Sequence, residues 1–372
     1  MHSFVALRLA ARREVFVLAG ASVAALLVLG CSSKSTTGGT TGTGGNSGCN
    51  PAEAQNTEFC AMGAPKADCS NQPTSKHQVC GVALPEPKMD LQRSANVMEY
   101  AGSGAPQVGC FSPSGYPAPP ATPQMVTVNG LAKIFSSGCN SNNLKITIYK
   151  VKRTNDSHDG ELDTPVGTPI TTDADCMTSG VAVADSKCTP SRYECKFSYA
   201  NVPTETELAI KTEGAPTWAP LIQYNIFIRN NQVMNGSYTY DVRALAAEDY
   251  TAIPAASIGG PVTAGHGVLA GEVHDCGDVR LIGAVADISQ FRVKALYFGS
   301  DEQSPLPDLS AESTSTLGLY AAFDVKPGPV TVAAMGKLNG QDVALGIHHV
   351  QIYPDSVTSV TFKGLQPYQL PH

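Results

Sequence analysis

The chain has 372 residues, of which 15% are charged and 42% are hydrophobic, and its formal net charge is −7. Glycine (35 residues) and proline (26 residues) are frequent, which favours turns and short strands over long helices. This composition excludes a coiled coil, a collagen-like rod and a protein with several membrane spans, and the net negative charge argues against nucleic acid as a partner.

Residues 1–30 have the pattern of a signal peptide. Three arginines precede an uncharged run, VFVLAGASVAALLVLG, which ends directly before Cys31. The run is shorter than the roughly 20 residues that span a bilayer, and it closes on small residues. Its end, Val-Leu-Gly-Cys, resembles the lipobox of bacterial lipoproteins. The alternatives are an uncleaved signal anchor and a secreted chain in which Cys31 is incidental.

The lipobox resemblance implies cleavage after Gly30, a diacylglyceryl group on the Cys31 thiol and a further acyl chain, such as palmitate, on the new amino group. The lipid bilayer would then be a partner of the chain through acylated Cys31, because several acyl chains give stable anchoring. Ser32 and Ser33 stand where an acidic residue would retain the protein in an inner membrane. We therefore expect a cell-envelope location, anchored to the outer membrane.

Two segments without a regular apolar pattern follow the signal peptide. Residues 31–48 consist almost entirely of Ser, Thr and Gly, so we expect a flexible tether, the alternative being a loop within a fold. Residues 49–122 are rich in Cys and Pro, and we expect an irregular, disulfide-rich module. Within it, Met89 to Tyr100 is a candidate short helix, because apolar side chains recur there at helical spacing.

Ten cysteines follow Cys31, and an even number in an exported chain predicts five disulfides of unknown pairing. Five of them precede residue 120 and five follow it, so complete oxidation requires at least one bridge between the two groups. Their spacing does not match the common zinc sites, and we expect no metal and no other cofactor. The ten are Cys49, Cys60, Cys69, Cys80, Cys110, Cys139, Cys176, Cys188, Cys195 and Cys276.

From residue 123 onward, apolar residues alternate with polar ones, which is typical of half-buried strands. In residues 222–228, Ile222, Tyr224 and Ile226 are expected on one face and Gln223 and Asn225 on the other. Hairpin turns are expected at Asn230-Asn231, returning along residues 233–240, and at Asn339-Gly340. The pattern predicts an all-β fold with two tandem antiparallel β-sandwiches, residues 123–242 and 265–364. They are joined by a linker with a short helix that Pro254 interrupts (243–264) and are followed by a tail (365–372).

Both predicted sandwiches resemble the carboxypeptidase regulatory-like domain, a transthyretin-like (prealbumin-like) β-sandwich. The motifs are TTDAD at residues 171–175 with FSYANVP at 197–203, and Ser315-Thr316-x-Gly318-x-Tyr320 with Asp324-Val325-x-Pro327-Gly328. The first copy departs from the family at Cys176, where the family has Gly, and carries an inserted cysteine-containing loop. The resemblance implies accessory modules without catalytic activity, and related sandwiches bind carbohydrate.

The common catalytic motifs are absent from the sequence, and the remaining candidates are weak. The segment NDSHDGELD (155–163) imitates a calcium loop but has Val166 where a bidentate Glu is needed. Within it, His158 and Glu161 form an H-x-x-E pair outside any catalytic domain. Tyr297, Tyr320, His274 and His348 are the residues that a dioxygenase-like iron site would use. Adjacent His348 and His349 would point to opposite faces of a strand and could not chelate one ion together.

Trp218 is the only tryptophan and lies between prolines in a predicted exposed connection, where its ring would stack on a sugar or fill a seam between domains. Together these patterns predict a non-catalytic envelope lipoprotein that presents β-sandwich modules for adhesion, scaffolding or assembly. Envelope proteins or glycans are its expected partners. The alternatives are a carbohydrate-binding lipoprotein, an enzyme accessory and a non-haem iron dioxygenase-like enzyme.

Overall fold

The structure, a computed structural model, describes residues 78–79, 82–112, 115, 117–154, 158–290, 295–302 and 305–369. The predicted signal peptide and tether, together with Cys31, Cys49, Cys60, Cys69 and Cys80, lie outside these ranges. The described residues all belong to one compact unit, Gly44–His372.

The first half of the described chain is a β-sandwich. Its strands alternate in burial because one face of each sheet packs on the other, and Ile146, Tyr199 and Ile210 are among the fully buried side chains between them. One sheet contains β7 (Val181–Val183), β8 (Arg192–Pro203), β4 (Met125–Phe135) and β12 (Val242–Ala246), with β11 (Ser237–Thr239) also beside β4. The facing strands are β6 (Leu162–Thr171), β5 (Lys145–Val151), β9 (Glu207–Gly214) and β10 (Trp218–Phe227).

The second half is also a β-sandwich, with a core that includes Leu269, Val332 and Phe362. One layer contains β17 (Pro307–Asp308), β16 (Ala295–Phe298), β18 (Leu319–Val325), β13 (Gly267–Glu272) and β21 (Val357–Val360). The other contains β15 (Val285–Ile288), β19 (Gly328–Leu338) and β20 (Gln341–Ile352). The predicted all-β class and its sandwich architecture are therefore confirmed.

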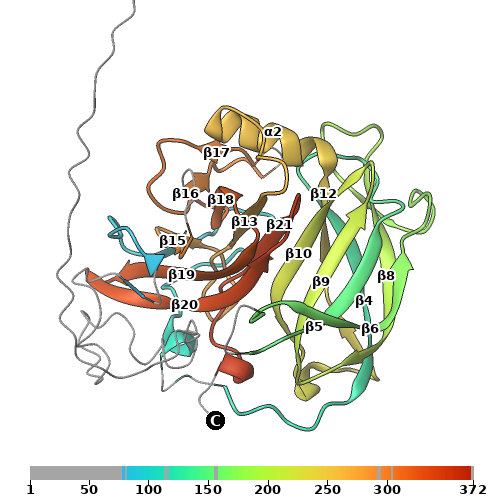
Figure 1. Ribbon diagram of the computed structural model, residues 1–372, viewed down its shortest axis with the longest axis horizontal. Coiled ribbons are helices and arrows are strands. Elements are labelled where there is room, and N and C mark those ends of the chain that lie inside the picture. Colours follow the sequence, from blue (N-terminus) through green and yellow to red (C-terminus); the bar gives the residue numbers. More distant parts are fainter. Residues whose placement is uncertain are drawn as a thin grey trace, which may run out of the picture. The chain divides into compact units, whose positions relative to one another are not determined.

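The two halves are joined by β21, which pairs in parallel with β10 on one side and with β13 on the other. Val357 lies opposite Leu221 of β10 and also opposite Val268 of β13. The strands of the first sandwich and the β17–β16–β18–β13–β21 layer of the second consequently belong to one 14-stranded sheet, whereas β15, β19 and β20 form a separate three-stranded sheet. In Figure 1, β21 lies beside β10, and α2 (Ala247–Ile258) lies across the ends of the strands from both halves.

The remaining elements are short. They are β1 (Gln78–Val79), β2 (Val82–Ala83), β3 (Gln92–Arg93), β14 (Leu281–Ile282), and the 3-10 helices η3 (Gly109–Phe111), η5 (Asn230–Gln232) and η6 (Pro367–Gln369). β3 pairs with β14, which attaches the segment before the first sandwich to the second one. Among the described residues, no helix is long and apolar enough to cross a membrane.

Three disulfides join described cysteines: Cys139–Cys188, Cys176–Cys195 and Cys110–Cys276. The first two lie within the first half, and the third links the cysteine-rich segment to the second half. The Cys110–Cys276 bridge connects one cysteine from before residue 120 with one from after it, as the parity of the cysteines requires.

The expected helix from Met89 to Tyr100 is wrong. Residues 92–93 form β3, and the rest of the segment is irregular. Leu91 is 3% exposed within the core of the second sandwich, and its backbone N–H donates to Lys337 O at 2.7 Å. The partners of this segment are strands, β14 for β3 and β19 for Leu91. An extended backbone can pair with them, whereas a helix would use its N–H and C=O groups internally.

Two local predictions in the first half are also corrected. Residues 230–232 form η5, and β11 pairs with β4 and not with β10, so no hairpin forms at Asn230-Asn231. The side chain of Glu205 accepts a hydrogen bond from Asn230 N–H at 2.7 Å, which supports this different turn. Helix α2 continues through Pro254, which is buried together with Ile253. Burial of this helix face offsets the backbone hydrogen bond that proline removes.

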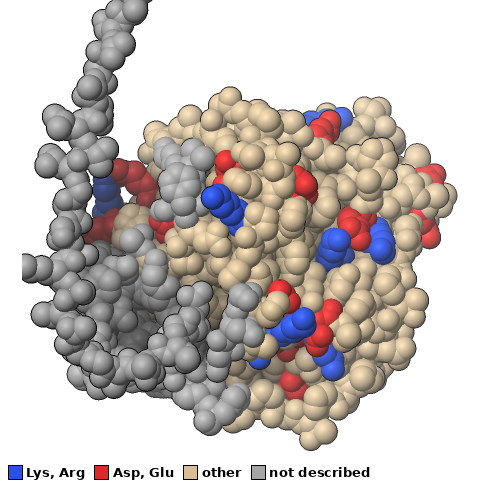
Figure 2. All heavy atoms as spheres, in the orientation of Figure 1, with Lys and Arg blue, Asp and Glu red and all other residues tan. Residues whose placement is uncertain are grey.

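Charged side chains on the face shown in Figure 2 lie mostly beside charges of the opposite sign. Ion pairs between partly exposed side chains also occur among the described residues, for example Lys152–Glu161 and Lys211–Glu213. Such mixing gives no extended field of one sign on that face.

Candidate ligand-binding site

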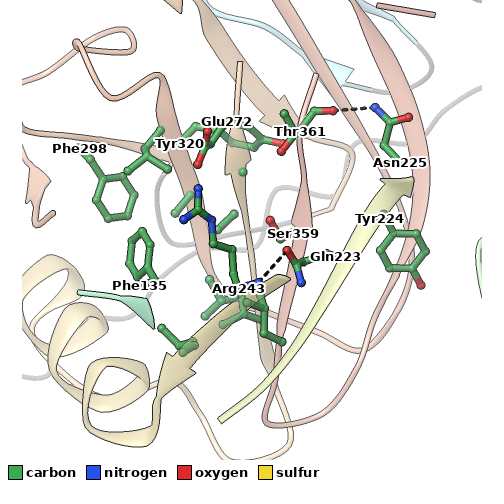
Figure 3. A pocket seen from close by; sticks show the side chains of 18 of the residues that line it. Phe135, Gln223, Tyr224, Asn225, Arg243, Glu272, Phe298, Tyr320, Ser359 and Thr361 are labelled. Carbon is green, nitrogen blue, oxygen red and sulfur yellow. Dashed lines mark hydrogen bonds between the residues drawn. The ribbon is translucent and has the colours of Figure 1, made fainter. Parts of the chain in front are cut away.

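A cavity of about 360 Å³ lies on the face of the shared sheet where the two halves join. Alternate residues of β10, β13 and β21 line it, while the residues between them face the core of the second sandwich. Gln223 of β10 lies next to Ser359 of β21, and Ser359 lies next to Ala270 of β13. Strands distant in sequence therefore contribute neighbouring side chains to one surface (Figure 3).

The lining changes from apolar to polar along these strands. On β21 the order is Val357, Ser359, Thr361 and then Lys363. Residues 361 and 363 continue to face the cavity beyond the end of β21, because Phe362 between them is held on the other side. Its N–H donates to Glu272 O, and its side chain is buried in the core of the second sandwich. β10 follows the same direction, with an apolar residue at 221 and amides at 223 and 225.

The apolar end is closed by α2 and by aromatic side chains. Phe135 and Phe298 lie close together on this side of the cavity in Figure 3. Ile253 and Pro254 of α2 also line it, and Leu221 and Phe323 belong to the same buried cluster. This end offers a ligand a surface that favours apolar groups.

Several polar atoms in the cavity have no hydrogen-bond partner among the described residues. Gln223 is 7% exposed, and its Nε2 is buried and unpaired, while its Oε1 accepts a hydrogen bond from Arg243 N–H at 3.3 Å. Tyr250 Oη of α2 is likewise buried and unpaired. Buried polar atoms normally have partners, so unpaired ones facing a cavity indicate where a bound molecule would be held.

A charged network lies at the polar end. Glu272 accepts hydrogen bonds from His274 Nε2 at 2.7 Å and from both Nε and an Nη of Arg280 at 3.3 Å. His274 Nδ1 lies 2.7 Å from Asp278 Oδ1. Arg243 donates to Glu99, and in Figure 3 its guanidinium points along the cavity toward Glu272.

These contacts set the protonation of the network. Burial by itself raises the pKa of Glu272, but the hydrogen bond and charge of His274 and the charge of Arg280 outweigh it and hold the pKa far below its usual value. Burial lowers the pKa of His274, and its hydrogen bonds to Asp278 and Glu272 reverse this and raise it. These contacts favour the ionised form of Glu272 and the protonated form of His274.

Lys363 differs from the other cations of this end because it has no ion pair among the described residues. Burial lowers the pKa of its ammonium group, and the nearby carboxylate of Asp278 opposes that shift. All four carboxylates that line the cavity, in contrast, have partners: Asp241 with Lys133, Asp249 with Ser137, Glu272 with His274, and Asp278 with His274.

Trp218 is not in this cavity. It begins β10, is 3% exposed and packs in the core of the first sandwich, where its Nε1 donates to Asn142 O at 2.8 Å. Its burial corrects the expectation of an exposed connection and removes it as a stacking platform. The flanking prolines had suggested a loop, but the strand tolerates Pro220 next to a register shift in the β9–β10 pairing.

The residues considered for an iron site have other partners. Tyr320 Oη donates to Val360 O at 2.9 Å, and both ring nitrogens of His274 contact carboxylates. Among the described residues, no group of three or more His, Cys, Asp or Glu is placed to hold a metal ion. In the calcium-like segment, residues 155–157 lie outside the described ranges, and His158 contacts Glu161 at 2.8 Å.

His348 and His349 lie on β20 and have different neighbours. The ring of His348 lies 5.2 Å from that of Phe362, and His349 Nδ1 lies 2.9 Å from Thr331 Oγ1. Burial, together with the charge of Arg153, lowers the pKa of His348 to about 3 and that of His349 to about 4. They are neutral groups inside the fold and do not share an ion.

These depressed pKa values predict acid sensitivity. The unfolded chain binds a proton on each histidine near pH 6.5, whereas the folded chain does not until much lower pH, so stability is lost as pH falls from about 6.5 toward 3. For His348 alone the loss is about 2 kcal/mol between pH 6 and pH 4.5. Urea titrations at both pH values measure the free energy of unfolding, and its loss between pH 6 and pH 4.5 should be smaller by about 2 kcal/mol in H348L than in the parent protein. H266L is the matched control, in which the loss should equal that of the parent. An equal loss in H348L and in the parent would contradict the prediction.

The residues that line the cavity were not singled out from the sequence. Gln223 and Ser359 belong to alternating strands, and alternation alone assigns polar residues to a solvated face. No local signal in the sequence distinguishes a solvated face from one that another part of the chain covers.

No family model matches the chain, and no curated protein matches it. Among solved structures, a variant of the shaft pilin SpaA from Lactobacillus rhamnosus GG is 12% identical, with a TM-score of 0.22, covering 65% of this chain and 100% of that one. The minor pilin GBS52 of Streptococcus agalactiae is 13% identical, with a TM-score of 0.18, covering 64% and 94%. The major pilin SpaD of Corynebacterium diphtheriae is 8% identical, with a TM-score of 0.18, covering 62% and 66%. We base no statement of function on these similarities.

Proposed function

We propose that the chain is an exported lipoprotein, anchored in the cell envelope through acylated Cys31, that presents its β-sandwich unit for adhesion, scaffolding or assembly without catalysing a reaction. The observation that carries this proposal is the set of three disulfides in the described unit. Disulfides persist in oxidising compartments outside the cytosol, which agrees with a signal peptide that ends at Cys31.

The architecture supports presentation of a single rigid body. Because β21 pairs with strands of both halves, the two sandwiches cannot rotate against each other without breaking backbone hydrogen bonds. The Cys110–Cys276 bridge also attaches the preceding segment covalently. The tether predicted for residues 31–48 would hold this body away from the lipid headgroups, and the outer membrane remains the proposed destination.

The resemblance to carboxypeptidase regulatory-like domains is also part of the proposal. Its support is that the second copy of the motif spans β18 and the turn into β19, with Asp324 and Gly328 at positive φ. The carbohydrate-binding alternative rested on Trp218 and on fold analogy. With Trp218 buried, no specific observation favours it. Selective binding of the detergent-solubilised protein on a glycan array would reinstate it.

The anchor gives the direct test. Because the thioether needs the Cys31 sulfur, C31S should abolish labelling by radioactive palmitate and should release the protein from the detergent phase or leave the precursor uncleaved. The neighbouring S33A variant is the matched control and should remain labelled and membrane-bound. A C31S protein that is still cleaved and still partitions with membranes would refute the lipoprotein assignment.

A further inference from the structure

The cavity at the junction of the two halves has the size of a small-molecule site. Its volume of about 360 Å³ falls within the roughly 300–1,000 Å³ of known ligand pockets. It is assembled from β10 in the first half, β13 and β21 in the second, and α2 between them. Tertiary pairing of β21 with both halves therefore builds it, and nothing in the proposed presentation function requires it.

The unpaired atoms of the cavity specify what one end of a ligand must carry. Gln223 Nε2 can only donate a hydrogen bond, and it is buried without an acceptor. The neighbouring hydroxyls of Ser359 and Thr361 also have no partner among the described residues. A ligand that fits must therefore bring an acceptor to this region, because a buried donor left unpaired is costly.

The charged side chains of the cavity indicate which charge the polar end of the ligand should carry. Each lining carboxylate has a hydrogen-bonded or ionic partner, and Arg243 is paired with Glu99. Lys363, which follows β21 and lies at the polar end of the cavity with Ser359 and Thr361, has no ion pair among the described residues. A cation without an ion pair therefore lies at the same end of the cavity as the unpaired donors, which favours an anionic group at that end.

The opposite end specifies the rest of the ligand. Val357, Leu221 and Phe298 line it, together with Ile253 and Pro254 of α2. From Val357 to Lys363, along β21 and the residues that follow it, an extended chain advances by about 20 Å at roughly 3.3 Å per residue. The polarity of the lining changes once along this length, so the complementary molecule is elongated, with an apolar part and a polar part.

We propose that this cavity binds an elongated amphipathic monoanion. Its apolar chain or ring lies against Leu221, Val357 and Phe298, and its carboxylate or comparable oxyanion accepts hydrogen bonds from Gln223, Ser359 and Lys363. Binding is non-covalent and neutralises Lys363 while satisfying the buried amide.

Octanoate and 1-octanol test this proposal as a matched pair of probes, since they share an eight-carbon scaffold and differ in charge. Each is titrated calorimetrically into the full-length lipidated chain in a maltoside detergent, with titration into micelles alone subtracted. Octanoate should bind more tightly than 1-octanol. K363M, which keeps the apolar stem, should weaken octanoate about tenfold and leave 1-octanol within about twofold.

Three further variants make the result specific to the cavity. K326M removes an exposed lysine outside it and should change neither affinity. Q223E keeps the acceptor for Arg243 N–H but replaces the donor, so octanoate should weaken. A270L fills the space beside Ser359 and should remove binding of both probes while circular dichroism shows an intact fold. Equal affinity for the two probes, no binding of octanoate, or an unchanged octanoate affinity in K363M would overturn the proposal.

Discussion

Replacing Glu207 with alanine should lower the free energy of unfolding by about 1.5–3 kcal/mol, because it removes a buried carboxylate that accepts charge-assisted hydrogen bonds from the partly exposed Arg153. Glu207 is 6% exposed, and it accepts hydrogen bonds from both Nε and an Nη of Arg153, the former at 2.7 Å. Arg153 also donates to His349 O at 2.9 Å and lies over the ring of Tyr368. The pair therefore links β9 of the first half to β20 and the C-terminal segment of the second.

Chemical denaturation of E207A, monitored by circular dichroism, measures this effect. E312A is the matched control, because the Lys88–Glu312 pair is exposed on both sides, and its loss should cost about 0.5 kcal/mol or less. The double variant R153M/E207L should recover much of the stability, since it removes both charges and keeps their volume. A loss in E207A no larger than that in E312A would show that the buried pair does not hold the two halves together.

Removing the Cys110–Cys276 bridge should cost about 2–5 kcal/mol. The bridge closes a loop with a sequence separation of 166 residues, so its loss restores much conformational freedom to the unfolded chain. It also frees a segment that has little core of its own, in which Leu91 and Phe111 are buried only through contact with the second sandwich. The variant C110A/C276A should therefore expose this segment to proteases before the sandwiches unfold.

The pair C139A/C188A is the control for loop length. Its bridge has a sequence separation of 49 residues, and the chain-entropy relation predicts a loss of unfolding free energy that is smaller by about 1 kcal/mol.

A second measurement uses proteolysis of the chain with all its cysteines. Cleavage between residues 111 and 124 should leave the preceding segment attached until a reductant is added. Mass spectrometry showing free thiols at Cys110 and Cys276, or release of the segment without reductant, would contradict the bridge.

Neighbouring residues were enough to predict a hairpin turn and much of the alternation of side chains along a strand. Asn339 and Gly340 both adopt positive φ and join β19 to β20, as their sequence indicated. The alternation correctly placed Ile222 and Tyr224 in one core. It failed at Ile226, which lies in the core of the first sandwich because the strand has a register shift between Gln223 and Ile226 and Asn225 adopts positive φ. The correctly predicted features follow from the pleat of a strand and from the few residues that tolerate a left-handed backbone, so neighbouring residues suffice to predict them.

Predictions failed where a distant segment outweighed the local preference. The segment from Met89 to Tyr100 has helical spacing, yet pairing of β3 with β14 and burial of Leu91 hold it extended. Trp218 stands between prolines and is nevertheless a core residue of a strand. In each case at least one of these contacts comes from a distant residue, Leu281 for β3 and Asn142 for Trp218, and a window of neighbouring residues contains no information about them.

The sequence by itself determined that the chain forms β-sandwiches, and it contains the lipobox-like signal from which export and anchoring are proposed, because alternation and the signal pattern are properties of neighbouring residues. Only the tertiary structure decided that the two sandwiches share a sheet and that a cavity forms where they join. β21 belongs to the C-terminal half but pairs with β10 of the first half. That pairing covers Gln223, whose position in the sequence indicates only a solvated strand face, and places it beside Ser359 in a cavity. A polar residue on a strand becomes a binding residue only when another segment removes it from water, and where that segment lies is a property of the whole fold.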